Sequence, residues 1–257
     1  MLLVKAMMLS CRPRVYLFPN MLKLDECIRL IRISQAVGLT PAITNDGSDS
    51  KRRNSGAWLD PREKPAVAEA ELINSIQQRL ALAARLPASH LEDLQMLHYG
   101  LDDAYDLHPD FIPRMAAGWQ ELARSGGQRV CTMLCYLSSS GLGSGGETHF
   151  PLAARPVQED SQGIADIIDP PQVTWGSDSS RKMSRVERRR NRSWGMPQAP
   201  AGGGLRVRPV AGSALLWFNT KPDGTHDKYS VHASLPVLDG EKWALSQWMR
   251  ERPYKEL

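Results

Sequence analysis

Several features that would classify a chain at once are scarce or missing in this sequence. Its 257 residues include only four cysteines, too few for a disulfide-stabilised scaffold. No apolar run approaches the ~20 residues that a membrane-spanning helix needs. The formal net charge of +4 is too small to require a nucleic acid or a membrane surface as a partner. With 42% hydrophobic residues the chain can bury a sizeable core, so we expect a soluble globular protein of one large or two small domains.

The cysteines are predicted to be free thiols. Cys131 and Cys135 lie four residues apart in the apolar run "VCTMLCYL", where an extended backbone would separate them by about 13 Å, too far for a disulfide. Cys27 falls inside a helical pattern, whereas the environment of Cys11 is not predicted. Buried free thiols leave the redox compartment, and with it the localisation, open.

The amino-terminal segment "MLLVKAMMLS" is apolar but lacks the organisation of a targeting sequence. Lys5 interrupts it, and the following "CRPR" contains no small-residue cleavage signal. We therefore expect neither a signal peptide nor a membrane anchor in this segment.

Two segments in the first third of the chain have the periodicity of amphipathic helices. In "LKLDECIRLIRISQAVG", apolar residues recur at positions i, i+3, i+4 and i+7, and the pattern ends at Gly38. A second helix is expected between Pro65 and Pro87. The predicted buried stripes are Leu24, Cys27, Ile28 and Ile31 in the first helix and Ile73, Ile76, Leu80 and Ala83 in the second.

From Leu94 onward the sequence changes to short apolar runs rich in β-forming residues, separated by Gly, Pro, Asp and Ser turns. Helices followed by many strands predict an α+β protein with a β-sandwich or barrel core. We therefore divide the chain into a helical supporting region, residues 1–93, and a β-rich core, residues 94–257. The expected strands lie within "LQMLHYG", "RVCTMLCYLS", "LRVRPV", "SALLWFN", "YSVHASLPV" and "KWALSQWM".

Polar and glycine-rich sequence interrupts the strand pattern at about residues 152–204, which we expect to form a long loop insertion. Within it, residues 181–192 contain seven basic residues and one acid, Glu187. Such a run is typical of a solvated loop, but it also fits a patch that binds an acidic peptide or a phosphate backbone.

Candidate metal ligands occur in "YDLHPDF", residues 105–111. In an extended segment the side chains of His108 and Asp110 leave the same face, so both can reach one metal ion. His232, at the end of a strand pattern, is the best third ligand, because a rolled sheet would bring it to the same place. Two imidazoles and one carboxylate leave three positions of an octahedral ion open, as in non-haem Fe(II) oxygenases. The alternative is that His232 is an ordinary hydrogen-bonded histidine of the core or surface.

The remaining histidines are weaker candidates. By strand alternation His98 and His149 face away from their neighbours Tyr99 and Thr148. His226 lies in a turn, "KPDGTHD", and His90 lies in a polar turn between the predicted helices and strands.

Four segments give the chain a detailed similarity to one enzyme family. They are "RRNSGAWL", "LQMLHYGLDDAYDLHPDF", "YLSSSGLGSGGETHFP" and "VRPVAGSALLWFNTKPDGTHDKYSVHASLPVLDGEKWALSQW". Through them the chain resembles the prolyl 4-hydroxylase family of Fe(II)- and 2-oxoglutarate-dependent dioxygenases. The resemblance implies a double-stranded β-helix (jelly roll) with supporting helices. It also implies that Fe(II) is bound by His108, Asp110 and His232.

The resemblance further implies how 2-oxoglutarate is held. Lys242 matches the family lysine that pairs with the distal carboxylate, and Tyr99 and Thr148 match positions that hydrogen-bond the same group. A cation in a buried pocket is chemically reasonable there, since the far charge of a dicarboxylate needs a counter-charge where water is excluded.

The implied substrate is a proline-rich peptide or protein. Tyr105 and Arg52 match positions that line the family's peptide groove, and Trp248 matches an aromatic position of the family motif whose implied role is packing. The implied reaction gives 4-hydroxyproline, succinate and CO₂ from O₂ and 2-oxoglutarate, with ascorbate as reductant. The resemblance also makes the endoplasmic reticulum a compartment to consider.

Two alternatives remain open at this stage. The same chemistry could act on another residue, a folded protein or a metabolite, because fold and iron site do not set the substrate. A different class of function is a binding module, in which the basic run 181–192 captures a nucleic acid or an acidic partner; the intact metal-ligand pattern argues against it.

Overall fold

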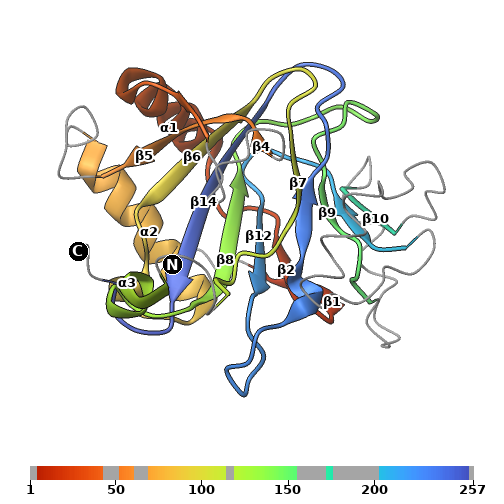
Figure 1. Cartoon of the computed structure of the whole chain (residues 1–257). Coiled ribbons are helices and arrows are strands. Elements are labelled where there is room, and N and C mark those ends of the chain that lie inside the picture. Colours follow the sequence, from red (N-terminus) through yellow and green to blue (C-terminus); the bar gives the residue numbers. More distant parts are fainter. Residues whose placement is uncertain are drawn as a thin grey trace.

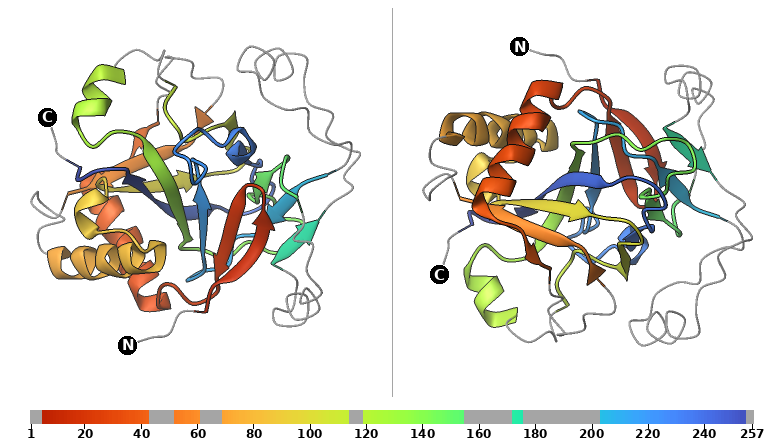
Figure 2. Two further views of the ribbon diagram at one scale, coloured as in Figure 1. Left: turned by 90° about the horizontal axis from the view of Figure 1, so that it is seen from below. Right: turned by 90° about the horizontal axis from the view of Figure 1, so that it is seen from above.

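The structure, a computed structural model, describes residues 5–42, 52–60, 69–113, 119–154, 172–175 and 203–254. Within these ranges two antiparallel sheets, of eight and six strands, lie face to face, and helices cover the outer face of the larger sheet (Figure 1). Figure 2 shows the same layers from below and from above, with the two longest helices on one side of the strands. This architecture confirms the predicted α+β class and the double-stranded β-helix.

The larger sheet has the strand order β1-β2-β12-β8-β14-β6-β5-β3. Four of its strands lie in the runs that the sequence predicted. These are β6 (Leu94–Tyr99), β8 (Arg129–Tyr136), β12 (Ala214–Phe218) and β14 (Lys242–Arg250). The others come from the amino-terminal part of the chain. They are β1 (Met7–Cys11), β2 (Arg14–Phe18), β3 (Thr40–Pro41) and β5 (Ser55–Leu59).

The smaller sheet has the strand order β10-β11-β9-β13-β7-β4. Its strands are β4 (Arg52–Arg53), β7 (Ala104–His108), β9 (Thr148–Phe150), β10 (Val173–Trp175), β11 (Leu205–Val207) and β13 (His232–Ser234). β10 lies inside the segment that we expected to be a loop insertion. Its β-forming residues Val173, Thr174 and Trp175 pair with β11 and extend the sheet. The basic run 181–192 falls outside the described residues.

Helix α1 (Leu24–Val37) ends at Gly38 as predicted. The predicted buried stripe is correct for Cys27, which is buried, and for Ile31, which packs against the core, but it is wrong for Leu24 and Ile28. Leu24 and Ile28 are 63% and 50% exposed, whereas Leu30 and Ile33 are buried. Compared with the prediction, α1 is rotated about its axis, because its buried face also carries Glu26. The carboxylate of Glu26 receives two hydrogen bonds from Arg79 of α2 (2.6 and 2.8 Å). A polar contact between the helices therefore determines which apolar residues face the sheet.

Helix α2 (Ala70–Ala84) has the predicted stripe, with Ile73, Ile76 and Leu80 fully buried and Ala83 packed at the margin. Two 3₁₀ turns, η2 (Ala88–His90) and η4 (Lys228–Ser230), and the short helix α3 (Trp119–Arg124) complete the described helical elements. None of the helices in the described residues is long and apolar enough to cross a membrane.

The central strands of the larger sheet are buried on both faces. Because side chains alternate along a strand, one set packs against the helices and the other faces the smaller sheet. On β8, Cys131, Met133 and Cys135 pack toward the helices, while Leu134 and Tyr136 point into the space between the sheets. β14 behaves in the same way: its alternate residues, beginning with Lys242, line the inner space. This inner face positions the site described below.

No disulfide joins any of the four cysteines, which agrees with the predicted free thiols of Cys27, Cys131 and Cys135. Cys27, Cys131 and Cys135 are buried, and Cys11 is exposed.

Candidate active site

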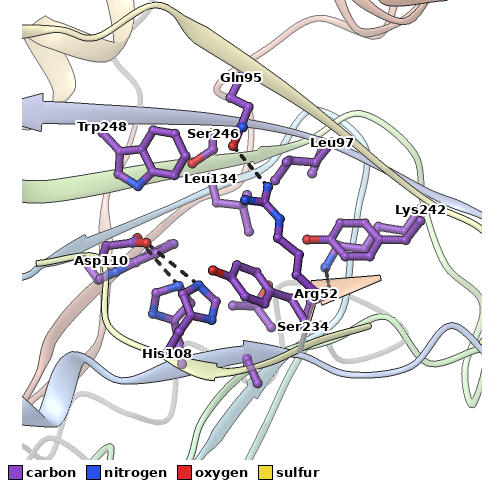
Figure 3. A pocket seen from close by; sticks show the side chains of 17 residues that line it. Arg52, Gln95, Leu97, His108, Asp110, Leu134, Ser234, Lys242, Ser246 and Trp248 are labelled. Carbon is purple, nitrogen blue, oxygen red and sulfur yellow. Dashed lines mark hydrogen bonds and ion pairs between the residues drawn. The ribbon is translucent and has the colours of Figure 1, made fainter. Parts of the chain in front are cut away.

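A pocket between the two sheets contains every site residue that the sequence predicted (Figure 3). The side chains of these residues come from six strands of the two sheets and from the turn after β7. The predicted residues that line the pocket are Arg52, Tyr99, Tyr105, His108, Asp110, Thr148, His232, Lys242 and Trp248.

Three of these residues form a cluster with the composition of a metal site. Strand pairing places His232 of β13 directly opposite His108 of β7, and Asp110 follows two residues after the end of β7. The Nε2 atoms of His108 and His232 lie 3.9 and 3.6 Å from the carboxylate oxygens of Asp110. The three ligand atoms all lie within 4.8 Å of one another, which is close enough for one ion to contact all three.

Hydrogen bonds to the backbone orient both imidazoles in the same way. Nδ1 of His108 lies 2.7 Å from the carbonyl oxygen of Asp106, and Nδ1 of His232 lies 3.0 Å from that of Ser230. Because a carbonyl only accepts, each Nδ1 carries the proton and donates it. In each ring Nε2 is therefore the nitrogen that faces the carboxylate and is available to a metal ion, which is the orientation that metal-binding histidines require.

The charges of the cluster also suit a cation. Burial lowers the pKa of His108 to about 3, so its ring is neutral at physiological pH. Burial alone would raise the pKa of Asp110, but His232, His108 and other neighbours outweigh burial and hold it below its usual range. Neutral imidazole and ionised carboxylate are the forms that bind metal ions. The donor set, with nitrogen and oxygen ligands on one side of the pocket, fits Fe(II).

The opposite side of the pocket carries a buried cation. In Figure 3 Lys242 and Ser234 lie away from His108 and Asp110, with Arg52 between them in this view. Lys242 is only 1% exposed, and among the described residues its Nζ has one hydrogen bond, 2.7 Å to Ser234 Oγ. An ammonium group has three donors, so two remain for an anion. Burial lowers the pKa of Lys242 to about 7, which shows that the site needs a counter-charge to keep the ammonium.

The hydroxyls of the pocket lie around this cation. The ring centroid of Tyr99 is 5.0 Å from Lys242 Nζ, and burial raises the pKa of Tyr99 to about 12, so its hydroxyl keeps its proton. Thr148 Oγ1 accepts a hydrogen bond of 2.7 Å from the hydroxyl of Tyr136. These groups form a polar pocket around the one buried ammonium, which fits a carboxylate.

Comparison with known proteins agrees with this chemistry. A family model described as the 2OG-Fe(II) oxygenase superfamily matches residues 94–250, more than half of the chain. The chain belongs to this superfamily. It is a 2-oxoglutarate-dependent dioxygenase of the prolyl 4-hydroxylase-like type, with the predicted triad of two histidines and one aspartate.

The relatives of this oxygenase include plant proteins that are named as prolyl 4-hydroxylases or probable prolyl 4-hydroxylases. It is 30% identical over 251 residues to "Probable prolyl 4-hydroxylase 3" of Arabidopsis thaliana, covering 96% of this chain and 72% of that protein. It is 28% identical over 254 residues to "Prolyl 4-hydroxylase 2" of the same plant, covering 95% of this chain and 70% of that protein.

Solved structures share the fold of the oxygenase at lower identity. The viral collagen prolyl hydroxylase of Paramecium Bursaria Chlorella virus-1 superposes with a TM-score of 0.53 at 19% identity, covering 91% of this chain and 94% of that one. A Pseudomonas putida prolyl-4-hydroxylase superposes with a TM-score of 0.50 at 15% identity, covering 93% and 92%. At these identities the likeness concerns the fold.

The edge strand β4 places Arg52 in the wall of the pocket, next to the Tyr105 ring that stacks on the triad residue His108. The guanidinium of Arg52 lies 4.8 Å from the ring centroid of Tyr105, which itself stacks on the His108 ring at 3.5 Å. Arg52 also donates hydrogen bonds to Asn54 and Gln95. Tyr105 therefore contacts a metal ligand directly, a contact that the sequence did not predict.

Trp248 of the oxygenase lines the pocket, and the side chain of Arg129 packs against its ring. The guanidinium of Arg129 lies 3.8 Å from its ring centroid, and Arg129 is held by a two-point ion pair with Glu92 (2.7 and 2.8 Å). Arg250 reaches the same carboxylate at 2.6 Å. Glu92 is 4% exposed, so this is a buried group of charges beside the site.

The sequence did not predict two residues that contact the site. Ser234, two residues after His232 on β13, lines the pocket. Tyr136, on the inner face of β8, donates its hydroxyl proton to the pocket residue Thr148. Strand alternation starting from a recognised site residue would have placed Ser234 in the pocket.

The other histidines are not part of the triad, as predicted. His98 contacts Glu241 at 2.7 Å and packs at a tilt against the ring of Trp243, on the face opposite Tyr99. His149 is half-buried between the buried residues of β9. His226 stacks on Phe111.

Proposed function

We propose that this oxygenase hydroxylates prolyl residues of peptide or protein chains at ring carbon C4. The observation that carries the proposal is that the triad and a buried lysine line the same pocket. The names of the plant relatives support proline as the substrate residue. When bound, Fe(II) and 2-oxoglutarate supply the oxidising chemistry, in which 2-oxoglutarate becomes succinate and CO₂ and one oxygen atom of O₂ enters the substrate.

In this proposal the chain binds and orients the reactants. His108, Asp110 and His232 hold the ion through one side and leave its other side facing the pocket. Lys242 donates to the distal carboxylate of 2-oxoglutarate, and the hydroxyls of Tyr99 and Thr148 hydrogen-bond the same group. Because the pocket is buried, these charge-assisted hydrogen bonds are stronger than they would be in water.

The substrate would reach the triad along the side where β4 forms the sheet edge. Tyr105 offers an aromatic face and Arg52 offers hydrogen-bond donors for backbone carbonyl groups. A polyproline II chain suits such a surface, because it is pre-ordered, exposes its carbonyls and stacks its rings on aromatic side chains. Ascorbate is proposed as the reductant that keeps the bound iron ferrous.

The test is turnover with a defined peptide. Purified protein is incubated with Fe(II), 2-oxoglutarate, O₂ and a proline-rich peptide, and succinate and the peptide mass are measured. We expect succinate release with one oxygen atom added at a proline, no product with His108→Ala, and normal product with His149→Ala, whose side chain does not line the pocket. Absence of turnover in the unaltered protein, or full turnover in His108→Ala, contradicts the proposal.

A peptide in which alanine replaces each proline separates proline hydroxylation from other substrates of the same chemistry. Oxidation of that peptide, or oxidation at a residue other than proline, would assign a different substrate to the same site.

A further inference from the structure

The carboxylate of Asp110 accepts a side-chain hydrogen bond from the larger sheet. Its Oδ2 atom accepts a hydrogen bond of 2.7 Å from Thr132 Oγ1, on the inner face of β8. Thr132 Oγ1 in turn accepts a hydrogen bond of 2.9 Å from Nδ2 of Asn219, which directly follows β12. The three side chains are 7%, 1% and 0% exposed, so water does not compete for these contacts.

This chain of hydrogen bonds has one direction. A threonine hydroxyl has a single proton, and it accepts from Asn219, so that proton is left for Asp110. The Oδ1 atom of Asn219 has no hydrogen-bond partner among the described residues. If the amide were turned over, its oxygen would compete with Asp110 for the threonine proton.

The backbone holds the start of the chain in place. The amide N–H of Asn219 donates to the carbonyl of Val130 (2.8 Å), and its carbonyl accepts from the N–H of Asp227 (2.9 Å). Thr132 lies between Trp217 and Trp248, its direct neighbours on the two flanking strands. Neither the threonine nor the asparagine can therefore move far from the carboxylate.

We infer that Thr132 and Asn219 are positioning residues that fix the plane of the Asp110 carboxylate, so that it presents one oxygen to the metal ion and keeps the rest of the coordination sphere open. This inference rests on the metal-dependent function proposed above. A carboxylate without such a partner can rotate about its terminal bond and take a second coordination position, which the co-substrate needs. The polarity set by Asn219 keeps the threonine proton on the carboxylate side.

The test measures metal binding to the ligand-free protein by titration with Co(II), whose visible absorption reports coordination. Thr132→Val keeps the shape of the side chain and removes the hydroxyl, and we expect its Kd for Co(II) to rise about 10- to 100-fold, the usual effect of losing an outer hydrogen bond to a ligand. Thr132→Ser restores the hydroxyl and is expected to bind within about threefold of the unaltered protein. The matched control is Ser213→Ala, which removes an equally buried hydroxyl that donates to the carbonyl of Val210 and makes no hydrogen bond to the triad. We expect this variant to keep the original Kd for Co(II).

Two changes at Asn219 separate polarity from packing. Asn219→Asp replaces the donor by an acceptor that competes for the threonine proton, whereas Asn219→Leu only removes the donor. We expect Asn219→Asp to weaken Co(II) binding more than Asn219→Leu, although Asp is closer to Asn in shape and polarity. In a Thr132→Val background the difference between the two is expected to disappear.

The outcomes are distinguishable. If the unaltered protein does not bind Co(II), the proposed function fails. If it binds Co(II) and Thr132→Val binds equally well, or Thr132→Ser is as weak as Thr132→Val, only the present inference fails. Should Thr132→Val not fold, as judged by thermal unfolding of the ligand-free protein, the order of the two Asn219 variants decides, and the reverse order overturns the inference.

Discussion

Lys242 offers the sharpest test of the co-substrate pocket, because its charge changes in a pH range that is easy to study. Burial lowers the pKa of Lys242 to about 7 in the ligand-free protein, although nearby Glu147 opposes the shift. A bound dicarboxylate favours the ammonium form. Binding of 2-oxoglutarate must therefore raise this pKa and take up a proton wherever the ligand-free lysine is neutral.

The size of the effect follows from the pKa. With a ligand-free pKa of about 7, the charged fraction of Lys242 falls from about three quarters at pH 6.5 to about 3% at pH 8.5. If only the ammonium form binds, the affinity for 2-oxoglutarate falls about 25-fold over this range. Proton uptake on binding rises over the same range from about 0.2 to about one per molecule bound.

Calorimetry of the Mn(II)-loaded protein measures both quantities, since titrations in two buffers of different ionisation enthalpy give the number of protons exchanged. Lys242→Arg is the control, because arginine stays charged at every pH used. We expect its proton uptake and its pH slope to vanish, whatever its absolute affinity. Equal proton uptake in the two proteins, or an affinity that changes less than about threefold in the unaltered protein, would refute the reasoning.

The other predictions concern stability and metal dependence. Glu92→Gln leaves buried Arg129 and Arg250 without a counter-ion and is expected to lower the free energy of unfolding by about 3–5 kcal/mol in urea titrations; a loss below about 1 kcal/mol would contradict this. Leu30→Ala should cost about 2–5 kcal/mol, but exposed Ile28→Ala less than about 0.5 kcal/mol, and similar values would show that α1 is oriented differently. Chelator-treated protein should lose turnover and regain it with Fe(II) but not with redox-inactive Zn(II); recovery with Zn(II) would exclude the oxygenase reaction.

The pH dependence of stability checks the Glu92 contact independently. Burial would raise the pKa of Glu92, but the charges and hydrogen bonds of Arg129 and Arg250 outweigh it and hold the pKa below its ordinary value of 4.5. A depressed folded-state pKa means that the contribution is present above about pH 4.5 and is lost as the pH falls through the folded-state value. We expect Glu92→Gln to flatten this acid limb of the stability profile.

Two of the three triad residues could be predicted from the sequence because their relative position depends only on the local backbone. Two residues of one extended segment, His108 and Asp110, share a face whatever the rest of the chain does. The same alternation correctly directed His98 and His149 away from the pocket. The third ligand needed more, since only the pairing of β13 with β7 brings His232 opposite His108.

The elements that the sequence did not predict depend on distant partners. β2 forms a strand by pairing with β12, near the other end of the chain, and its hairpin partner β1 begins in the apolar segment that we examined for targeting signals. The orientation of α1 depends on Arg79 of another helix, which draws the acidic Glu26 to the buried face. Helical periodicity predicted the helix but could not reveal which charged residue would find a buried partner.

The polar residues between the two sheets are better explained by function than by stability. Most of that space is filled by apolar side chains, and a buried polar group costs free energy unless it is hydrogen-bonded. Side-chain hydrogen bonds nevertheless cross from one sheet or its connecting turn to the other, and three of them hold a triad residue or a group near the buried lysine. They are Thr132 to Asp110, Tyr136 to Thr148 and Lys242 to Ser234.

Apolar residues in these six positions would pack the sandwich without any need for partners, so stability does not explain them. Their common property is that they hold a metal ligand or the surroundings of the buried ammonium at a fixed place between the sheets. The smaller sheet supplies the imidazoles and the larger sheet supplies the lysine, and the polar contacts that cross the gap keep the two halves in register. A change in the packing of the sheets would therefore alter metal binding and co-substrate binding together, whereas a change in one crossing contact would alter only the group that it holds.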